Sequence, residues 1–160
     1  LIYRREQIGH SLEGFGFVVP AIEKRSILAC TFGSQKYRGR APAGTVILRA
    51  FVGGAMFPDK FDLDDEELIA ATIADVSELL SIRGDPERVL LSRYHRSMAQ
   101  YHLGHLERVE RIERLVTTEP GLALAGNAYR GTGIPDCIHS GDLAAARLIE
   151  HIEHLERTAP

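Results

Sequence analysis

The sequence predicts an α+β fold in which an antiparallel or mixed sheet is followed by helices. Three observations carry this prediction. Runs of β-branched and aromatic residues with the length of strands occupy the first half of the chain. Apolar residues recur at helical spacing in three longer segments. A glycine-rich stretch, residues 126–133, separates the last two of these segments. The 160 residues suit one domain or a large piece of a bigger protein.

Three segments have the composition of strands, and they are residues 15–19, 27–32 and 45–52. A turn at residues 23–25 makes the first two an antiparallel hairpin, because short connections cannot join parallel strands. A loop rich in Gly and Pro, residues 38–44, precedes the third strand. Residues 89–94 are a candidate fourth strand.

Three helices are expected. The first begins near Asp62 or Asp64, either of which can cap it, and ends before Gly84. The second covers residues 105–116 and the third residues 135–157. The apolar faces that we expect these helices to bury are, in order, Ile69, Ile73, Val76 and Leu80; Leu106, Val109, Ile112 and Val116; and Ala145, Leu148, Ile152 and Leu155.

The glycine-rich stretch is the segment most informative about function. A short predicted strand, residues 122–125, stops at Gly126, and a loop with Gly131 and Gly133 leads into the last helix. Strand, turn and helix start in this order form a site for electron-rich groups, because the first N–H groups of a helix have no partner within it. Asp136 stands where the dinucleotide fingerprint has its third Gly. A plain strand–helix connection without a ligand explains the stretch equally well.

Composition excludes several classes of protein. The net charge of −3 argues against a nucleic-acid partner. Two cysteines, Cys30 and Cys137, form neither a disulfide framework nor a zinc site and indicate a reducing compartment, so we expect a cytoplasmic protein. No apolar run reaches the roughly 18 residues of a membrane-spanning helix. His102 and His105 share a helical spacing without supporting ligands, and we expect no metal.

Five motifs resemble the protoporphyrinogen oxidases, which belong to the amine-oxidase-like flavoproteins. These motifs, in chain order, are LEGFGFVVP (12–20), RGRAP (38–42), FVGG (51–54), QYHLGH (100–105) and AGNAYRGTGIPDCIHSG (125–141). The resemblance covers nearly the whole chain. It implies an FAD-dependent enzyme of haem biosynthesis that oxidises protoporphyrinogen IX or coproporphyrinogen III to the porphyrin, with molecular oxygen as the final electron acceptor.

The resemblance also implies an organisation and a set of contacts. Residues 1–93 would be part of a substrate-binding domain, and residues 94–160 the C-terminal segment of a split FAD-binding domain. The flavin would be contacted by Tyr94, Gly131, Thr132, Gly133 and Ile134. The tetrapyrrole would be contacted by Phe17, Val19 and Tyr37. Arg38, Arg40 and Arg49 could meet its carboxylates, although a surface role for the two loop arginines is favoured. No catalytic residue is predicted. Asp136 is expected to cap the last helix, and Cys137 to be a buried inert thiol.

Two features depart from the family. Ala99 and Tyr37 replace the usual Pro and Phe, and the G-x-G-x-x-G segment that holds the FAD pyrophosphate is absent from these residues. Because the chain opens on Leu1, we expect a C-terminal fragment that is inactive alone and able to self-associate. Another amine-oxidase-like flavoprotein, such as an amine oxidase or a carotenoid desaturase, and a folded non-catalytic domain are the alternatives. Peripheral contact with a membrane is left open.

Overall fold

The computed structural model describes residues 1–55 and 57–158, which form two compact units, Leu1–Arg93 and Tyr94–Pro160. The first unit contains a sheet with the strand order β1-β4-β3-β2, in which every neighbouring pair is antiparallel. The strands are β1 (Ile2–Arg4), β2 (Gly16–Val18), β3 (Ile27–Phe32) and β4 (Thr45–Val52). The α+β prediction is therefore confirmed, and the sheet is antiparallel rather than mixed.

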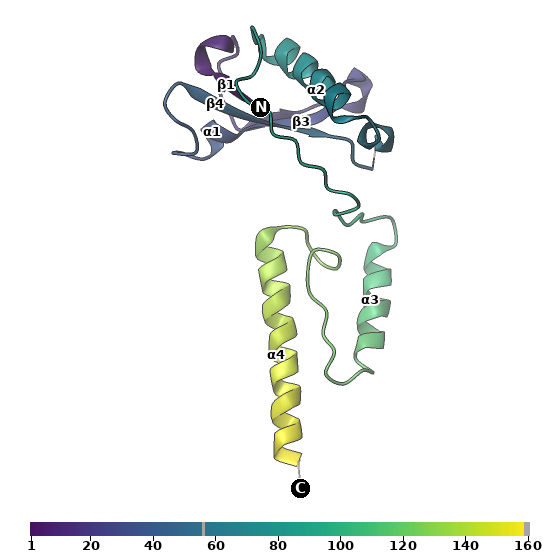
Figure 1. The fold of residues 1–160 in the computed structure, drawn as a ribbon. Coiled ribbons are helices and arrows are strands. Elements are labelled where there is room, and N and C mark those ends of the chain that lie inside the picture. The colour runs from purple at the N-terminus through teal and green to yellow at the C-terminus, as the bar shows by residue number, and fades with distance from the viewer. Residues whose placement is uncertain (56, 159–160) are drawn as a thin grey trace. The chain divides into compact units, whose positions relative to one another are not determined.

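One face of this sheet is covered by α2 (Asp65–Leu80), as Figure 1 shows. Alternation along β4 turns Val46 and Leu48 into the core, and they pack there with Val76 and Leu80 of α2. The predicted buried face of α2 is shifted by one residue in the first half of the helix. Leu68 and Thr72 are buried, whereas Ile69 and Ile73 are only partly buried.

Local interactions explain where α2 begins and where it ends. Asp64 is the N-cap, and its Oδ1 accepts a hydrogen bond from the Glu67 N–H at 2.8 Å. The helix ends at Leu80 instead of continuing to Gly84. Ser81 adopts the left-handed conformation with φ 52°, and the Ile82 N–H donates to the Ser77 carbonyl at 2.9 Å, which closes the last turn.

The short elements of the first unit complete its chain path. They are three 3-10 turns and one short helix: Arg5–Gln7, Ala21–Glu23, Pro58–Phe61 and α1 (Gly33–Lys36). The candidate strand at residues 89–94 is wrong, because only Arg88 forms an isolated bridge, with Ile2. The Arg93 guanidinium instead binds the Leu63 carbonyl at 2.7 Å and the Asp65 carboxylate at 2.8 Å.

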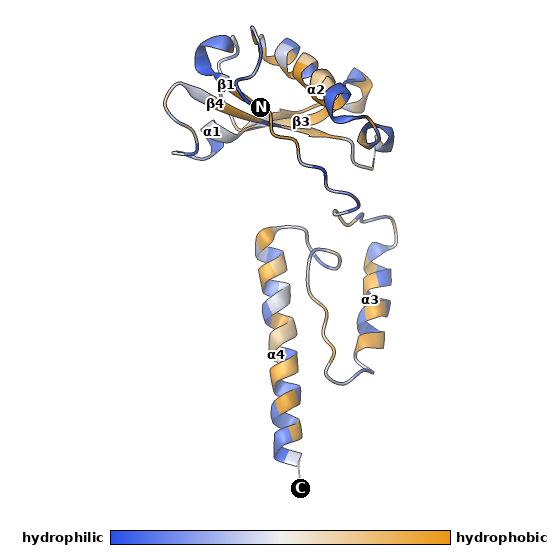
Figure 2. Cartoon of the chain, viewed as in Figure 1, coloured by the Kyte–Doolittle hydropathy of each residue, from blue (hydrophilic) through white to orange (hydrophobic). Residues whose placement is uncertain are grey.

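The second unit contains α3 (His105–Val116) and α4 (Ile134–Thr158). Residues 122–125 are extended but not a strand, because a strand needs a neighbour and the described residues of this unit contain none. The predicted burial along α4 is also wrong. Ala145, Ile152 and Leu155 are exposed, and Leu148 is partly buried. No described helix or strand packs extensively against α4, and Figure 2 shows apolar residues along its whole length. On α3, only Val109 is fully buried.

None of the helices in residues 1–55 and 57–158 is both long and apolar enough to cross a membrane.

The two cysteines differ in environment, which predicts selective labelling. Cys30 lies in the core with no exposed surface, and burial raises the pKa of its thiol to about 11. Cys137, at the start of α4, is partly exposed, so the expectation that it is buried is wrong. At pH 8 the Cys30 thiol is almost entirely protonated, so we expect iodoacetamide to modify Cys137 and spare Cys30 in the native full-length protein. Peptide mass spectrometry measures both sites. Equal labelling before and after urea denaturation would contradict the burial of Cys30.

Candidate functional site

The glycine-rich segment forms an irregular loop that ends at the first turn of α4. Gly126 and Gly131 have φ values of 112° and 91°, which residues with a Cβ rarely adopt. The Gly126 N–H donates to Ser140 Oγ of α4 at 2.9 Å, and Ser140 Oγ donates to the Cys137 carbonyl at 3.0 Å. The start of the loop is thereby tied to the helix that follows it.

The backbone at the other end of the loop presents free donors. In the described part of the chain, no hydrogen bond uses the N–H groups of Gly131, Thr132 or Ile134. These groups precede or open α4, where the helix dipole is positive. An electron-rich acceptor such as a ring carbonyl fits this arrangement.

Asp136 acts on the same turn from within the helix. Its Oδ2 accepts a hydrogen bond from the Gly133 N–H at 3.2 Å, as expected for a capping carboxylate. The side chain also fills the space beside Gly131, since a Cβ built on Gly131 would lie 2.7 Å from Asp136 Cβ. Only glycine fits there, both for its φ and for its contact with Asp136.

Two side chains from α3 and the segment before it hold the middle of the loop. The Tyr101 hydroxyl donates to the Asn127 carbonyl at 2.8 Å, and His105 Nε2 lies 2.7 Å from the Tyr129 carbonyl oxygen. The two rings stack on each other with a centroid distance of 3.8 Å. We call Tyr101 and His105 the aromatic clasp. Sequence reasoning placed both residues in a motif and considered His105 as a metal ligand, but it did not find these contacts, because the partners are backbone atoms more than twenty residues away.

An ion pair between Arg130 of the loop and Glu113 of α3 also holds the loop. Arg130 donates to both carboxylate oxygens of Glu113 on α3, at 2.9 and 2.7 Å. This hydrogen bonding lowers the pKa of Glu113 below its usual value. The contact of His105 with the Tyr129 carbonyl is a structural one. Among residues 1–55 and 57–158, no group of three His, Cys, Asp or Glu side chains is arranged to bind a metal ion.

The residues predicted to contact the tetrapyrrole lie in the first unit, and no contact recorded among the described residues joins Tyr37 to Phe17 or Val19. Phe17 and Val19 pack against the core on the face that α2 covers, and the Phe17 ring meets Phe32 edge-on at 6.1 Å. Tyr37 follows α1 and is 48% exposed. Their role as one pocket therefore stays a prediction that no described contact supports.

The opposite face of the sheet carries Val18 and Phe51, which sequence reasoning did not select, and Arg49, which it considered as a partner for the substrate carboxylates. Val18 is 79% exposed, and its register partner on β3 is Ala29, which pairs in turn with Phe51 of β4. The Arg49 guanidinium lies 5.0 Å from the centroid of the Phe51 ring. Strict alternation from the buried residue Leu48 could have placed Arg49 and Phe51 on this face.

Tyr94, the remaining predicted flavin contact, opens the second unit and is 66% exposed.

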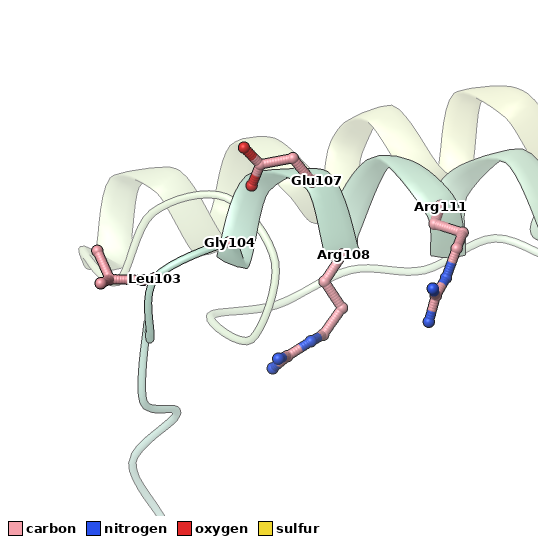
Figure 3. Close-up of a pocket in the computed structure, with 5 residues that line it drawn as sticks. All are labelled: Leu103, Gly104, Glu107, Arg108 and Arg111. Carbon is pink, nitrogen blue, oxygen red and sulfur yellow. The ribbon is translucent and has the colours of Figure 1, made fainter.

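The surface of the chain has a hollow beside α3, away from the glycine-rich loop residues. It encloses about 330 Å³ and is lined by Leu103, Gly104, Glu107, Arg108 and Arg111. Figure 3 shows Arg108 and Arg111 extending to the same side of the helix, away from Glu107. A second hollow, of about 540 Å³, lies between the 3-10 turn at Arg5–Gln7 and Gly44. No predicted site residue lines either hollow.

Known proteins resemble this chain over most of its length. The coproporphyrinogen III oxidase of Bacillus subtilis (strain 168) is 37% identical over 141 residues, which are 88% of this chain and 30% of the relative. The enzyme of the same name from Staphylococcus aureus (strain NCTC 8325 / PS 47) is 33% identical, covering 95% of this chain and 33% of the relative. The chain spans about a third of the length of these curated relatives.

A solved structure has the same fold. The crystal structure of a protein from Exiguobacterium sp. 255-15, named provisionally as a protoporphyrinogen oxidase, superposes with a TM-score of 0.76 and 34% identity. The match covers 94% of this chain and 33% of that chain. The sequence model of the flavin containing amine oxidoreductases matches residues 3–149. The resemblance drawn from the motifs is confirmed, and the chain belongs to the flavin-containing amine oxidoreductase family.

Proposed function

We propose that this chain forms part of an FAD-dependent oxidase that converts protoporphyrinogen IX or coproporphyrinogen III to the porphyrin in haem biosynthesis. Membership of a flavin-containing family supports the cofactor. The names of the similar proteins support the substrate class. In this proposal residues 1–93 belong to the substrate-binding domain and residues 94–160 to the FAD-binding domain.

The observation that carries the proposal is the row of free N–H groups at Gly131, Thr132 and Ile134, at the start of α4. When bound, FAD supplies a hydride acceptor that molecular oxygen reoxidises. The free N–H groups fit the edge of the flavin ring where negative charge develops, and fixed donors stabilise such charge without reorganising. The hydrogen bond that the Asp136 carboxylate accepts from the Gly133 N–H assigns Asp136 a capping role at this turn.

In this proposal the aromatic clasp holds the loop rigid. Tyr101 and His105 bind carbonyls on the loop, so their contacts leave the N–H groups of Gly131 and Thr132 available to a ligand. The substrate would contact Phe17, Val19 and Tyr37, as the resemblance to the family implies. Cytoplasmic location, peripheral membrane contact and self-association stay predictions.

The test uses the full-length protein purified and reconstituted with FAD. We expect flavin absorbance at one FAD per chain, bleaching when a porphyrinogen is added without oxygen, and recovery with formation of fluorescent porphyrin when oxygen is admitted. A protein that retains no flavin would overturn the cofactor assignment. Oxidation of amines with no oxidation of either porphyrinogen would instead assign the protein to the amine oxidases.

A further inference from the structure

The glycine-rich loop is held from two sides, and its free donors lie between the two sets of contacts. Toward α4, hydrogen bonds hold the loop at Gly126 and Gly133. Between these two glycines, the hydrogen bonds and ion pairs of the described chain hold the loop only at residues 127–130, and all of them come from α3 or the segment before it. The free N–H groups begin directly after these contacts, at Gly131. The contacts with α3 therefore determine how the backbone enters the row of free donors.

The two rings of the aromatic clasp brace each other. Tyr101 and His105 stack with a centroid distance of 3.8 Å and an interplanar angle of 13°. Gly104, the N-cap of α3, lies between them in sequence and has φ 78°, a conformation that residues with a Cβ rarely adopt. The chain can therefore turn here and lay the Tyr101 ring against the first residue of the helix. Because each ring limits the rotation of the other, the Tyr101 hydroxyl and His105 Nε2 reach their two loop carbonyls in one fixed arrangement.

The clasp binds acceptors of the loop and none of its donors. Its partners are the carbonyls of Asn127 and Tyr129, two residues apart. The N–H groups of Gly131 and Thr132 are thus held in place without being used. A donor that is fixed in advance stabilises a developing negative charge more than a donor that must reorient. Loss of the clasp should therefore weaken most the ligand form that carries more negative charge at this turn.

Oxidised and reduced flavin differ in the charge that such donors meet. Uptake of a hydride, which is two electrons and one proton, gives the flavin ring one negative charge. Donors that are held toward this ring bind the reduced form more tightly than the oxidised form. The ratio of the two affinities sets the midpoint potential of the bound flavin relative to that of free flavin.

We propose that Tyr101 and His105 are positioning residues that raise the midpoint potential of the flavin, because they hold the N–H groups of Gly131 and Thr132 toward it. This inference rests on the proposed function, in which the loop borders the flavin ring. Both side chains act through the backbone of the loop. A higher potential makes the flavin a stronger acceptor of the hydride that the substrate gives up.

The experiment measures the midpoint potential of the flavin in the full-length, FAD-loaded protein by anaerobic reduction beside a reference dye. Tyr101→Phe removes the hydroxyl and keeps the ring stack. We expect reduced FAD to lose about tenfold more affinity than oxidised FAD, the typical effect of one hydrogen bond. For a two-electron couple, this tenfold change lowers the potential by about 30 mV. His105→Leu should lower the potential at least as much, and His105→Gln, which keeps a side-chain N–H donor, should recover part of the loss.

The matched control is His102→Leu. His102 belongs to the same motif as the clasp, is exposed, and makes no side-chain hydrogen bond within residues 1–55 and 57–158. Its replacement should leave the potential unchanged. Fluorescence titration of each apoprotein with oxidised FAD gives a second readout, and its Kd should stay within about threefold of the wild-type value in Tyr101→Phe.

The alternative is that the clasp only stabilises the fold. In that case Tyr101→Phe lowers the urea midpoint and weakens oxidised and reduced FAD equally, so the potential is unchanged and the inference is overturned. An equal shift in His102→Leu would overturn it as well. If His105→Leu does not fold, Tyr101→Phe, which removes a single oxygen atom, decides. A wild-type protein that retains no flavin would overturn the proposed function itself, a result distinct from an unchanged potential in a flavin-loaded variant.

Discussion

Alanine at Gly131 is expected to weaken FAD binding by the full-length protein about 30-fold or more. The left-handed φ of 91° costs a residue with a Cβ about 1–2 kcal/mol. The new Cβ would also lie 2.6 Å from Asp136 Cγ and 2.7 Å from its Cβ, so α4 or the loop must move. Movement of Asp136 breaks its bond to the Gly133 N–H, a further cost of about 1 kcal/mol. Fluorescence titration of the apoprotein with FAD measures the change.

Two neighbouring glycines provide controls for the separate causes. Gly126→Ala imposes a similar φ strain at 112° but leaves its Cβ with no atom within 4 Å, so its effect should be clearly smaller. Gly133→Ala brings its Cβ 2.9 Å from Asp136 Oδ2, the movable end of a side chain, and should be intermediate. Bulkier residues at Gly133 should weaken binding further. Unchanged FAD affinity in Gly131→Ala would show that this loop does not contact the cofactor.

Sequence reasoning located the elements whose signals are local. The bounds of β3, β4 and α3 agree with those predicted, because each has an uninterrupted apolar pattern and clear turn residues at its ends. The three residues of β1 are too few to show a period, and their pairing with β4 depends on a partner more than forty residues away. The prediction of which α4 residues are buried also failed because burial depends on a distant partner. An apolar face indicates that a helix packs against something, but it does not identify the segment that packs there.

The candidate site was predictable to a similar degree. The glycine pattern and the helix start identified the loop and the capping role of Asp136, which depend on neighbouring residues. The aromatic clasp joins side chains to distant backbone carbonyls, and no residue type in the loop signals such a contact. On the sheet, Phe17 and Val18 are adjacent in sequence but lie on opposite faces, so an error of one residue exchanges a core side chain for an exposed one.

Removing the Asp75 carboxylate is expected to destabilise the first unit by about 2–3 kcal/mol. Asp75 lies in the middle of α2, and its Oδ2 accepts hydrogen bonds from the N–H groups of Ser26 and Ile27 at 2.6 and 3.2 Å. These bonds join the helix to the start of β3. Asp75→Ala leaves two partly buried donors without an acceptor and leaves Arg25 without one of its two carboxylates. Urea unfolding of the full-length protein, combined with hydrogen exchange of residues 26–32, measures the loss.

The control is Glu78→Ala, which removes the other carboxylate that Arg25 binds, at 2.7 Å. Glu78 is 69% exposed, so water replaces the lost contact and the urea midpoint should change little. The hydrogen bond from Arg25 lowers the pKa of Glu78, so its contribution is present above the pKa of the unfolded chain and is lost as the pH falls through the lower, folded value. Asp75→Asn keeps one acceptor oxygen and should lie between the two alanine variants. If Glu78→Ala destabilises β3 as much as Asp75→Ala, then Arg25, and not the backbone of β3, is the group through which α2 holds the sheet.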